Sequence, residues 1–238
     1  MSIRNLLYKN ELVINDSIKI VIPTVGQILD NEERYYGLVS QLVAMPIDLM
    51  VPLDDAGIDF TQINEYDLFL LLFPNLQTQD TSLIFGDLDL KKFSLAINEE
   101  NGMTVMLDKE NDIIIDRAIY GRIADSLRQI HHIEKNIKKP ANKEAQDYLL
   151  ERARKKLKRR MGRTEDSQIE SLITAMVNTQ QFKYTFEGVR DLTIYQFNES
   201  VKQVVKKVDY ENKMFGVYTG NLDVKTLNQD DLNWLVHK

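Results

Sequence analysis

The N-terminal stretch of the chain has the period-two alternation of a β-hairpin. Residues 11–23 hold two short apolar segments separated by Asn15 and Asp16, a pair typical of a tight turn. The alternating apolar positions of the second segment are Ile18, Ile20 and Ile22. This pattern predicts two paired strands with one buried face.

A helix signal follows the hairpin directly. Thr24 and Gln27 have the spacing of a capping box, in which two side chains satisfy backbone amides at the start of a helix. The predicted buried stripe consists of Ile28, Tyr35, Val39, Leu42 and Val43. Pro46 lacks an amide proton and restricts the residue before it, so we expect the helix to end there.

The following segments predict a further helix and a group of strands. The apolar content of residues 64–73 favours a second helix. Residues 82–97 and 103–115 alternate like strands, and Asn101 with Gly102 is a turn signal between them. We therefore expect this half of the chain to mix strands and helices.

From Asp116 onward the periodicity becomes helical. The predicted helix starts are Asp116, Ser167 with Glu170, and Thr193 with Gln196. Their apolar stripes comprise Ile119, Ile123, Leu127 and Ile130; Ile169, Leu172, Ile173, Met176 and Val177; and Ile194, Phe197, Val201, Val204, Val205 and Val208. Residues 143–161 predict a further helix, and Gly220 with Asn221 is a cap for the last one.

These patterns predict an α+β fold, with a mixed strand and helix part followed by a mainly α-helical part. Residues 137–144 form a polar connector with a proline, which is typical of a boundary. We therefore expect an acidic α+β domain over residues 1–137 and a basic helical domain over residues 138–238.

Composition narrows the class of protein. The 238 residues include no cysteine, which excludes disulfides, thiolate catalysis and cysteine metal sites and suits a reducing compartment. The longest apolar run, residues 68–73, is about a third of a membrane span. We expect neither export nor membrane insertion.

Charge is distributed unevenly along the chain. Residues 1–116 carry 7 Lys and Arg against 20 Asp and Glu, whereas residues 117–238 carry 23 against 16. Such a split indicates two domains, or one domain whose halves attract each other. The acidic half argues against a dedicated nucleic-acid binder, because it would repel phosphate.

The basic residues concentrate between Arg152 and Arg163, where 8 of 12 residues are Lys or Arg. Acidic residues precede them on the same predicted helix, an order that complements the helix dipole and allows pairing one turn apart. Three interpretations remain open: a solvated helix face, a surface that docks on an acidic protein surface such as the N-terminal half, and a nucleic-acid contact. The stretch has no interleaved aromatic residues, so we expect no nucleic-acid partner.

Candidate catalytic groups are sparse. Asp87 and Asp89 would share one face of a strand, and His131 with Glu134 has helical i,i+3 spacing, so a metal-dependent enzyme is one hypothesis. A half-exposed strand and a solvated helix face explain the same residues. No phosphate-binding loop or nucleophile motif is present. We expect no enzyme and assign no catalytic residue, metal site or cofactor.

Two long stretches resemble phage proteins of the tail assembly chaperone type, which are encoded beside the tape measure gene in phages and prophages of Gram-positive bacteria. The first is "IPTVGQIL…YYGLVSQLVAMPIDLMVPLDDAGIDF" (22–60). The second is "LITAMVNTQQFKYTFEGVRDLTIYQFNESVKQVVKKVDYENKMFGVYTGNLD" (172–223), followed by "LNWL" (232–235). The resemblance covers most of the chain and rests on hydrophobic and turn patterns, without a catalytic signature.

The resemblance implies a non-enzymatic chaperone in the host cell cytoplasm that binds the tape measure protein during tail morphogenesis. The alternative is a structural component retained in the phage tail or virion. Other tail proteins, the tape measure or tail tube, would be the partners, and a homo-oligomer is possible. Candidate partner-binding residues are Arg154, Lys155, Lys158, Arg159, Ile169, Leu172, Met176, Tyr210, Met214, Phe215 and Tyr218. A core role competes with partner binding for the apolar members. Trp234 could anchor a partner or tack the C-terminal tail to the core, and we favour the second role.

Overall fold

The computed structural model describes residues 5–99, 102–160 and 167–235 and has an α+β fold, with small antiparallel sheets in the N-terminal half and a helical C-terminal part. The strands are β1 (Glu11–Val13), β2 (Lys19–Val21), β3 (Ser94–Ile97), β4 (Thr104–Asp108) and β5 (Ile113–Ile115). The α-helices are α1 (Val25–Leu29), α2 (Glu32–Leu42), α3 (Met50–Asp55), α4 (Glu65–Gln77), α5 (Ser82–Phe85), α6 (Arg117–His131), α7 (Lys143–Arg160), α8 (Gln168–Val177), α9 (Phe186–Arg190) and α10 (Ile194–Tyr218). The 3₁₀ helices are η1 (Leu6–Tyr8), η2 (Pro46–Leu49), η3 (Leu90–Lys92), η4 (Val224–Thr226) and η5 (Gln229–Asp231).

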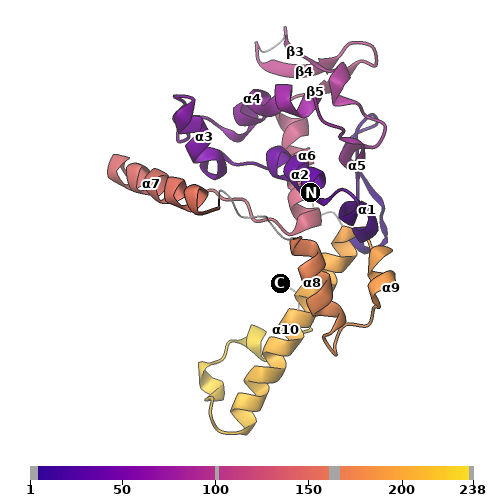
Figure 1. Cartoon of the computed structure of the whole chain (residues 1–238), viewed down its shortest axis with the longest axis vertical. Coiled ribbons are helices and arrows are strands. Elements are labelled where there is room, and N and C mark those ends of the chain that lie inside the picture. The colour runs from indigo at the N-terminus through magenta and orange to yellow at the C-terminus, as the bar shows by residue number, and fades with distance from the viewer. Residues whose placement is uncertain (1–4, 100–101, 161–166, 236–238) are drawn as a thin grey trace.

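Helix α6 lies at the centre of the arrangement. It contacts α4, β2 and β5 on the N-terminal side and α10 on the C-terminal side. Figure 1 shows the β3–β4–β5 sheet at one end of the molecule and α8, α9 and α10 at the other. Helices α7 and α10 both extend away from this body.

The predicted N-terminal hairpin is confirmed. Strands β1 and β2 pair antiparallel, and the opposed residues Leu12 and Ile20 are both buried. The side chain of Asn15 accepts hydrogen bonds from the amides of Ser17 and Ile18, at 3.0 and 2.8 Å. This local bonding forms the turn that the sequence pattern predicts.

The helix predicted after Thr24 is present but interrupted. Its capping box forms as expected. Asn31 then leaves the helical region, with φ of −146°, and divides the segment into α1 and α2. The second helix ends at Leu42 and not at Pro46, which instead begins η2.

The strand predicted over residues 82–97 is wrong for its first half. Asp80 accepts a hydrogen bond from the amide of Ser82, α5 follows, and Gly86 ends that helix with φ of +60°. Only β3 is extended, and it pairs with β4, which pairs with β5, as predicted for residues 103–115. Of the predicted turn, Asn101 lies outside the described residues, whereas Gly102 has a positive φ of 67°. Period-two alternation in a stretch this short also fits a helical turn.

The helices predicted from Asp116 onward are confirmed. Asp116, Ser167 and Thr193 each accept the expected backbone hydrogen bond as N-caps. The last helix ends with Gly220 in the left-handed region, φ of +73°, as its glycine predicted.

Two helix starts that are distant in sequence pair with each other. Thr24 and Thr193, each the N-cap of a capping box, form an antiparallel β-bridge. The amide of Val25 donates to the carbonyl of Leu192 at 2.8 Å, and the amide of Ile194 donates to the carbonyl of Pro23 at 2.9 Å. The entrance of α1 is thereby joined to the entrance of α10.

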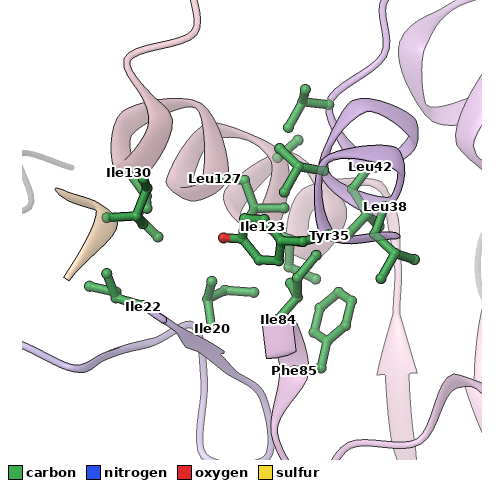
Figure 2. Close-up of a cluster of buried hydrophobic side chains, with 14 of the residues drawn as sticks. Ile20, Ile22, Tyr35, Leu38, Leu42, Ile84, Phe85, Ile123, Leu127 and Ile130 are labelled. Carbon is green, nitrogen blue, oxygen red and sulfur yellow. The ribbon is translucent and has the colours of Figure 1, made fainter. Parts of the chain in front are cut away.

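One large hydrophobic core contains residues from both halves of the chain. Figure 2 shows side chains from β2, α2, α5 and α6 converging. Those labelled are Ile20, Ile22, Tyr35, Leu38, Leu42, Ile84, Phe85, Ile123, Leu127 and Ile130. The same cluster extends to Ile169, Val189 and Phe197 in the C-terminal helices. The proposed division between residues 137 and 138 stays a prediction.

A buried arginine fastens α6 to α4. The Arg128 side chain is 6% exposed, pairs with Glu65 and donates to the carbonyl of Val43 at 2.7 Å. Lys135 pairs with the second oxygen of Glu65. Removal of either charged group would leave the other in a poorly solvated position without this partner, so the pair stabilises the position of α6 against α4.

The contact between α1 and α9 gives a direct test of the fold. A Cβ on Gly26 would lie 3.1 Å from the carbonyl oxygen of Arg190, whereas a Cβ on Gly37, within α2, meets nothing within 4 Å. We expect Gly26→Ala to lower the free energy of unfolding by about 1–3 kcal/mol. Gly37→Ala should raise it by about 0.5–1 kcal/mol, because alanine favours helix. Urea denaturation of both variants measures the difference, and equal effects would contradict close packing of α1 on α9.

Candidate partner-binding surfaces

Helix α10 begins in the core and ends far from it. Ile194 and Phe197 are buried, at 1% and 0% exposure. Further along, Val201 and Val204 are only partly buried against the core. Figure 1 shows the rest of α10 projecting away from the other elements, with the C-terminal segment beside it.

The apolar stripe of α10 continues beyond the core. Phe215 follows Phe197 by five helical turns, at about 3.6 residues each, so both lie on the same side of the helix. Phe215 is nevertheless 69% exposed, and Tyr218 is 85% exposed. Tyr210 and Met214 lie one turn apart on the adjoining side and are half-buried. We call Tyr210, Met214, Phe215 and Tyr218 the α10 tip.

The C-terminal segment packs against α10 close to the α10 tip. Lys213 pairs with Asp231 at 2.6 Å, and the Lys207 ammonium lies 5.7 Å from the centroid of the Trp234 ring. A Cβ on Gly216 would meet Leu222 at 3.2 Å. Trp234 therefore tacks the tail to the projecting part of α10 and not, as expected from the sequence, to the core, and these contacts leave Phe215 and Tyr218 exposed.

The other apolar candidates, on α8, divide between core and surface. Ile169 and Met176 are buried, at 4% and 5% exposure, so both serve the core in this structure. Leu172 is 38% exposed. Of the three, only Leu172 presents a surface to a partner.

The basic helix α7 docks on the acidic half of its own chain. Arg154 donates to Asp54 at 2.7 Å and to Asp55 at 2.6 Å, and these two carboxylates raise its pKa. Gln146 donates to Asp59 at 2.9 Å, and Leu150 is buried. The interpretation of α7 as a helix that docks on the N-terminal half is thus confirmed for this face.

The remaining cations of α7 point elsewhere. Lys155 pairs with Glu151 one turn earlier at 2.6 Å, as the sequence order predicted. Lys158 and Arg159 are exposed, and neither makes an ion pair within the described residues. Met161, the last residue of the predicted helix over residues 143–161, lies outside the described residues.

The acidic and histidine candidates for metal binding do not come together. Asp87 and Asp89 lie on no strand, and Asp89 caps η3 by accepting from the amide of Lys91. Helix α6 ends at His131, so Glu134 does not share its face. Across residues 5–99, 102–160 and 167–235, no group of three or more His, Asp or Glu side chains is placed to hold a metal ion.

His131 has a structural role that its sequence position did not reveal. Its Nε2 atom lies 2.9 Å from the hydroxyl of Tyr35, a buried core residue. Burial, with a smaller effect of the neighbouring His132, lowers the pKa of His131 to about 4. His132 lies 3.1 Å from Glu199 on α10, and burial also lowers its pKa.

Sequence reasoning missed the apolar surface on which α7 rests. It consists of Ala44, Leu53, Phe60 and Leu68. Their spacing gave no regular period, because Leu53 and Leu68 come from helices α3 and α4, whereas Ala44 and Phe60 lie in the segments before these helices. The acidic run at residues 54–59 was a signal, since it provides the carboxylates that receive Gln146 and Arg154.

A family model described as the YomV second domain matches residues 162–237, a segment that includes α8, α9 and α10. YomV is a phage-region protein of Bacillus, so the match is consistent with a phage protein. No curated protein and no solved structure matches the chain. Among the described residues, no helix combines the length and the apolar character that crossing a membrane requires.

The His131–Tyr35 contact predicts a pH dependence of stability. The folded-state pKa of about 4 lies below the ordinary value of 6.5, so the unfolded chain binds the proton more tightly. Stability is therefore fully present above about pH 6.5 and falls as the pH approaches 4, by up to about 1.4 kcal/mol per pH unit.

Urea denaturation at pH 7 and pH 5 measures this dependence. We expect His131→Gln to lose clearly less stability between the two pH values than the unmodified chain. His132→Gln is the matched control, because its pKa shift has the same sign but the side chain is more exposed. An unchanged pH dependence in His131→Gln would contradict the assignment.

Proposed function

We propose that this protein is a non-enzymatic phage tail assembly protein, a chaperone that binds the tape measure protein during tail morphogenesis. It would act in the host cell cytoplasm, through protein–protein contact and without a cofactor. We propose no nucleic-acid partner and no membrane partner.

The observation that carries the proposal is the α10 tip. Large apolar side chains sit on the outer end of a helix that projects from the body, with Phe215 69% and Tyr218 85% exposed. Solvent-facing aromatic residues grouped in this way are typical of a contact surface. A helical partner with its own apolar stripe can pack along the continuing stripe of α10.

The composition of the α10 tip fits a chaperone. Aromatic side chains bury a large apolar area with few rotatable bonds, and the flexible Met214 side chain adapts to varied partners. A tape measure protein is long and helical, so it presents many similar apolar stripes in place of one unique site. The YomV second domain match covers α10, and the sequence resemblance to tail assembly chaperones covers the same helix.

The alternative function is a structural component retained in the tail, and the edge strand β3 favours it. Within the described part of the chain, strand β3 pairs on one side, with β4, and its other side is an open edge. Leu95 and Ile97 on this strand are 49% and 71% exposed. An exposed apolar edge strand can add a strand from a neighbouring subunit, as a homo-oligomer or tail ring requires.

The two functions are separated by following the protein through assembly. The chain is co-expressed with the long coiled-coil protein encoded beside it, captured, and then sought by mass spectrometry in purified particles. A chaperone binds the long protein and is absent from particles. Stoichiometric copies in particles would establish the structural component, and neither result would reject both functions.

The role of the α10 tip predicts a separation of binding from stability. Tyr218→Ser should reduce capture of the tape measure protein at least tenfold, because an aromatic contact is lost. The free energy of unfolding should change by less than about 0.5 kcal/mol, since the side chain is exposed. Tyr8→Ser is the matched control, because Tyr8 is 89% exposed but lies in η1. Equal loss of capture in both variants, or in neither, would contradict a specific role of the α10 tip.

A further inference from the structure

We infer that α7 is a releasable internal occupant of a helix-binding surface, and that a basic amphipathic helix of a partner protein displaces it. The surface consists of Ala44, Leu53, Phe60 and Leu68, and we call it the α7-docking surface. The inference goes beyond the proposed function and does not depend on the α10 tip.

The hold of α7 on this surface is small. Of its 18 residues, only Gln146 and Leu150 are buried. The ion pairs of Arg154 join half-exposed groups, with side-chain exposures of 40% for Arg154, 46% for Asp54 and 57% for Asp55. Exposed pairs of this kind contribute little to stability. Leu150 is therefore the one residue of α7 in the buried apolar cluster.

The chain before α7 allows the helix to leave. Residues 133–142 form neither helix nor strand between the end of α6 and the start of α7, and the residues that tie this connector to the body, Lys135 to Glu65 and Asn136 to Asp48, lie in its first half. Figure 1 shows α7 reaching away from the body along α3, at the end of this extended connector. Release of α7 would thus leave the large core, to which it contributes no residue, undisturbed.

The α7-docking surface has more apolar area than α7 uses. The residues packed around it are only partly buried: Ile47, Leu49, Met50, Ile58, Ile63 and Leu72. A helix with two or three apolar residues on one face would cover more of this area than Leu150 alone. Greater apolar burial gives tighter binding, so such a helix competes with α7.

The contacts of α7 define the chemistry of the competing helix. An amide donor at Gln146 meets Asp59, an apolar residue follows four positions later at Leu150, and a cation four positions after that meets Asp54 and Asp55. The three carboxylates make the rim of the surface acidic. The partner helix is therefore basic at the flanks of its apolar stripe, and the acidic rim also disfavours nucleic acid.

The last turns of α7 add little to its hold. Leu157 follows Leu150 by two helical turns and so faces the same side, yet it is 51% exposed. The end of α7 thus extends beyond the surface that covers Leu150.

The test uses a fluorescent peptide with the sequence of residues 143–160 as the probe and the full-length chain as the receptor. The tethered α7 has a high effective concentration, so the unmodified chain should bind the peptide weakly. In the Leu150→Ala, Arg154→Ala double variant the internal occupant is weakened and the docking surface is intact. We expect this variant to bind the peptide at least tenfold more tightly.

Two controls keep the result specific. The Tyr148→Ala, Arg152→Ala double variant changes exposed positions on the outer side of α7 and should bind the peptide as the unmodified chain does. A scrambled peptide of equal charge should not bind the release variant. Equal binding of the scrambled peptide would show charge attraction alone and would overturn the inference.

The absence of cysteine permits a second, reversible test. Cysteines placed at Asp54 and Arg154 are joined by a short cleavable bismaleimide, which locks α7 onto α3. Locking should abolish peptide binding, and cleavage should restore it. Binding that is unaffected by the lock, or a release variant that binds no better than the unmodified chain, would overturn the inference. If the release variant formed a stable dimer in which two copies exchange α7, the occupant of the surface would be a second copy of this chain, and the inference of a partner helix would be overturned.

Discussion

The pairing of two helix starts, Thr24 and Thr193, is the constraint on which the rest of the arrangement depends. Each threonine caps its own helix, and the flanking backbone groups bond across the junction through Val25 and Ile194. Two helix entrances thus satisfy amides and carbonyls that would otherwise be unpaired in a buried region. The direction of α10 follows, because its first turn is fixed against the N-terminal hairpin and α1.

Two helices extend away from the core of the molecule, α10 from this junction and α7 from the connector after α6. Helix α10 carries its apolar stripe outward until Phe215 and Tyr218 are exposed. Helix α7 also reaches outward, but its surface is mainly charged, and Leu150 is its one buried leucine at the contact with the body. A rigid base with two projecting helices suits a protein that acts by contact with helical partners, since the partner-facing groups are held clear of the core that stabilises them.

The sequence predicts features that depend on neighbouring residues. The caps at Thr24, Asp116, Ser167 and Thr193 each accept from the amide three residues on, so their spacing suffices to locate helix starts. Local reasoning failed over residues 82–90, because Asp80 and Gly86 enclose a short helix whose apolar residues also alternate like a strand. It also missed the interruption at Asn31.

The contacts that shape the candidate surfaces are tertiary and could not be predicted in this way. The sequence revealed an acidic half and a basic helix but not that Arg154 meets Asp54 and Asp55 in the same chain. No local pattern shows that the apolar stripe of α10 continues beyond the hydrophobic core. Phe197 and Phe215 occupy equivalent positions on this stripe and differ only in what covers them. Exposure is a property of the packed molecule.

Hydrogen exchange of the full-length chain, with and without the tape measure protein, would show whether the α10 tip is the surface that this partner covers. We expect the partner to slow amide exchange in residues 210–218 at the end of α10, where the isolated chain has few covering contacts. The junction at Thr24 and Thr193 should be protected in both states. Unchanged exchange at the α10 tip in a saturated complex would contradict the account.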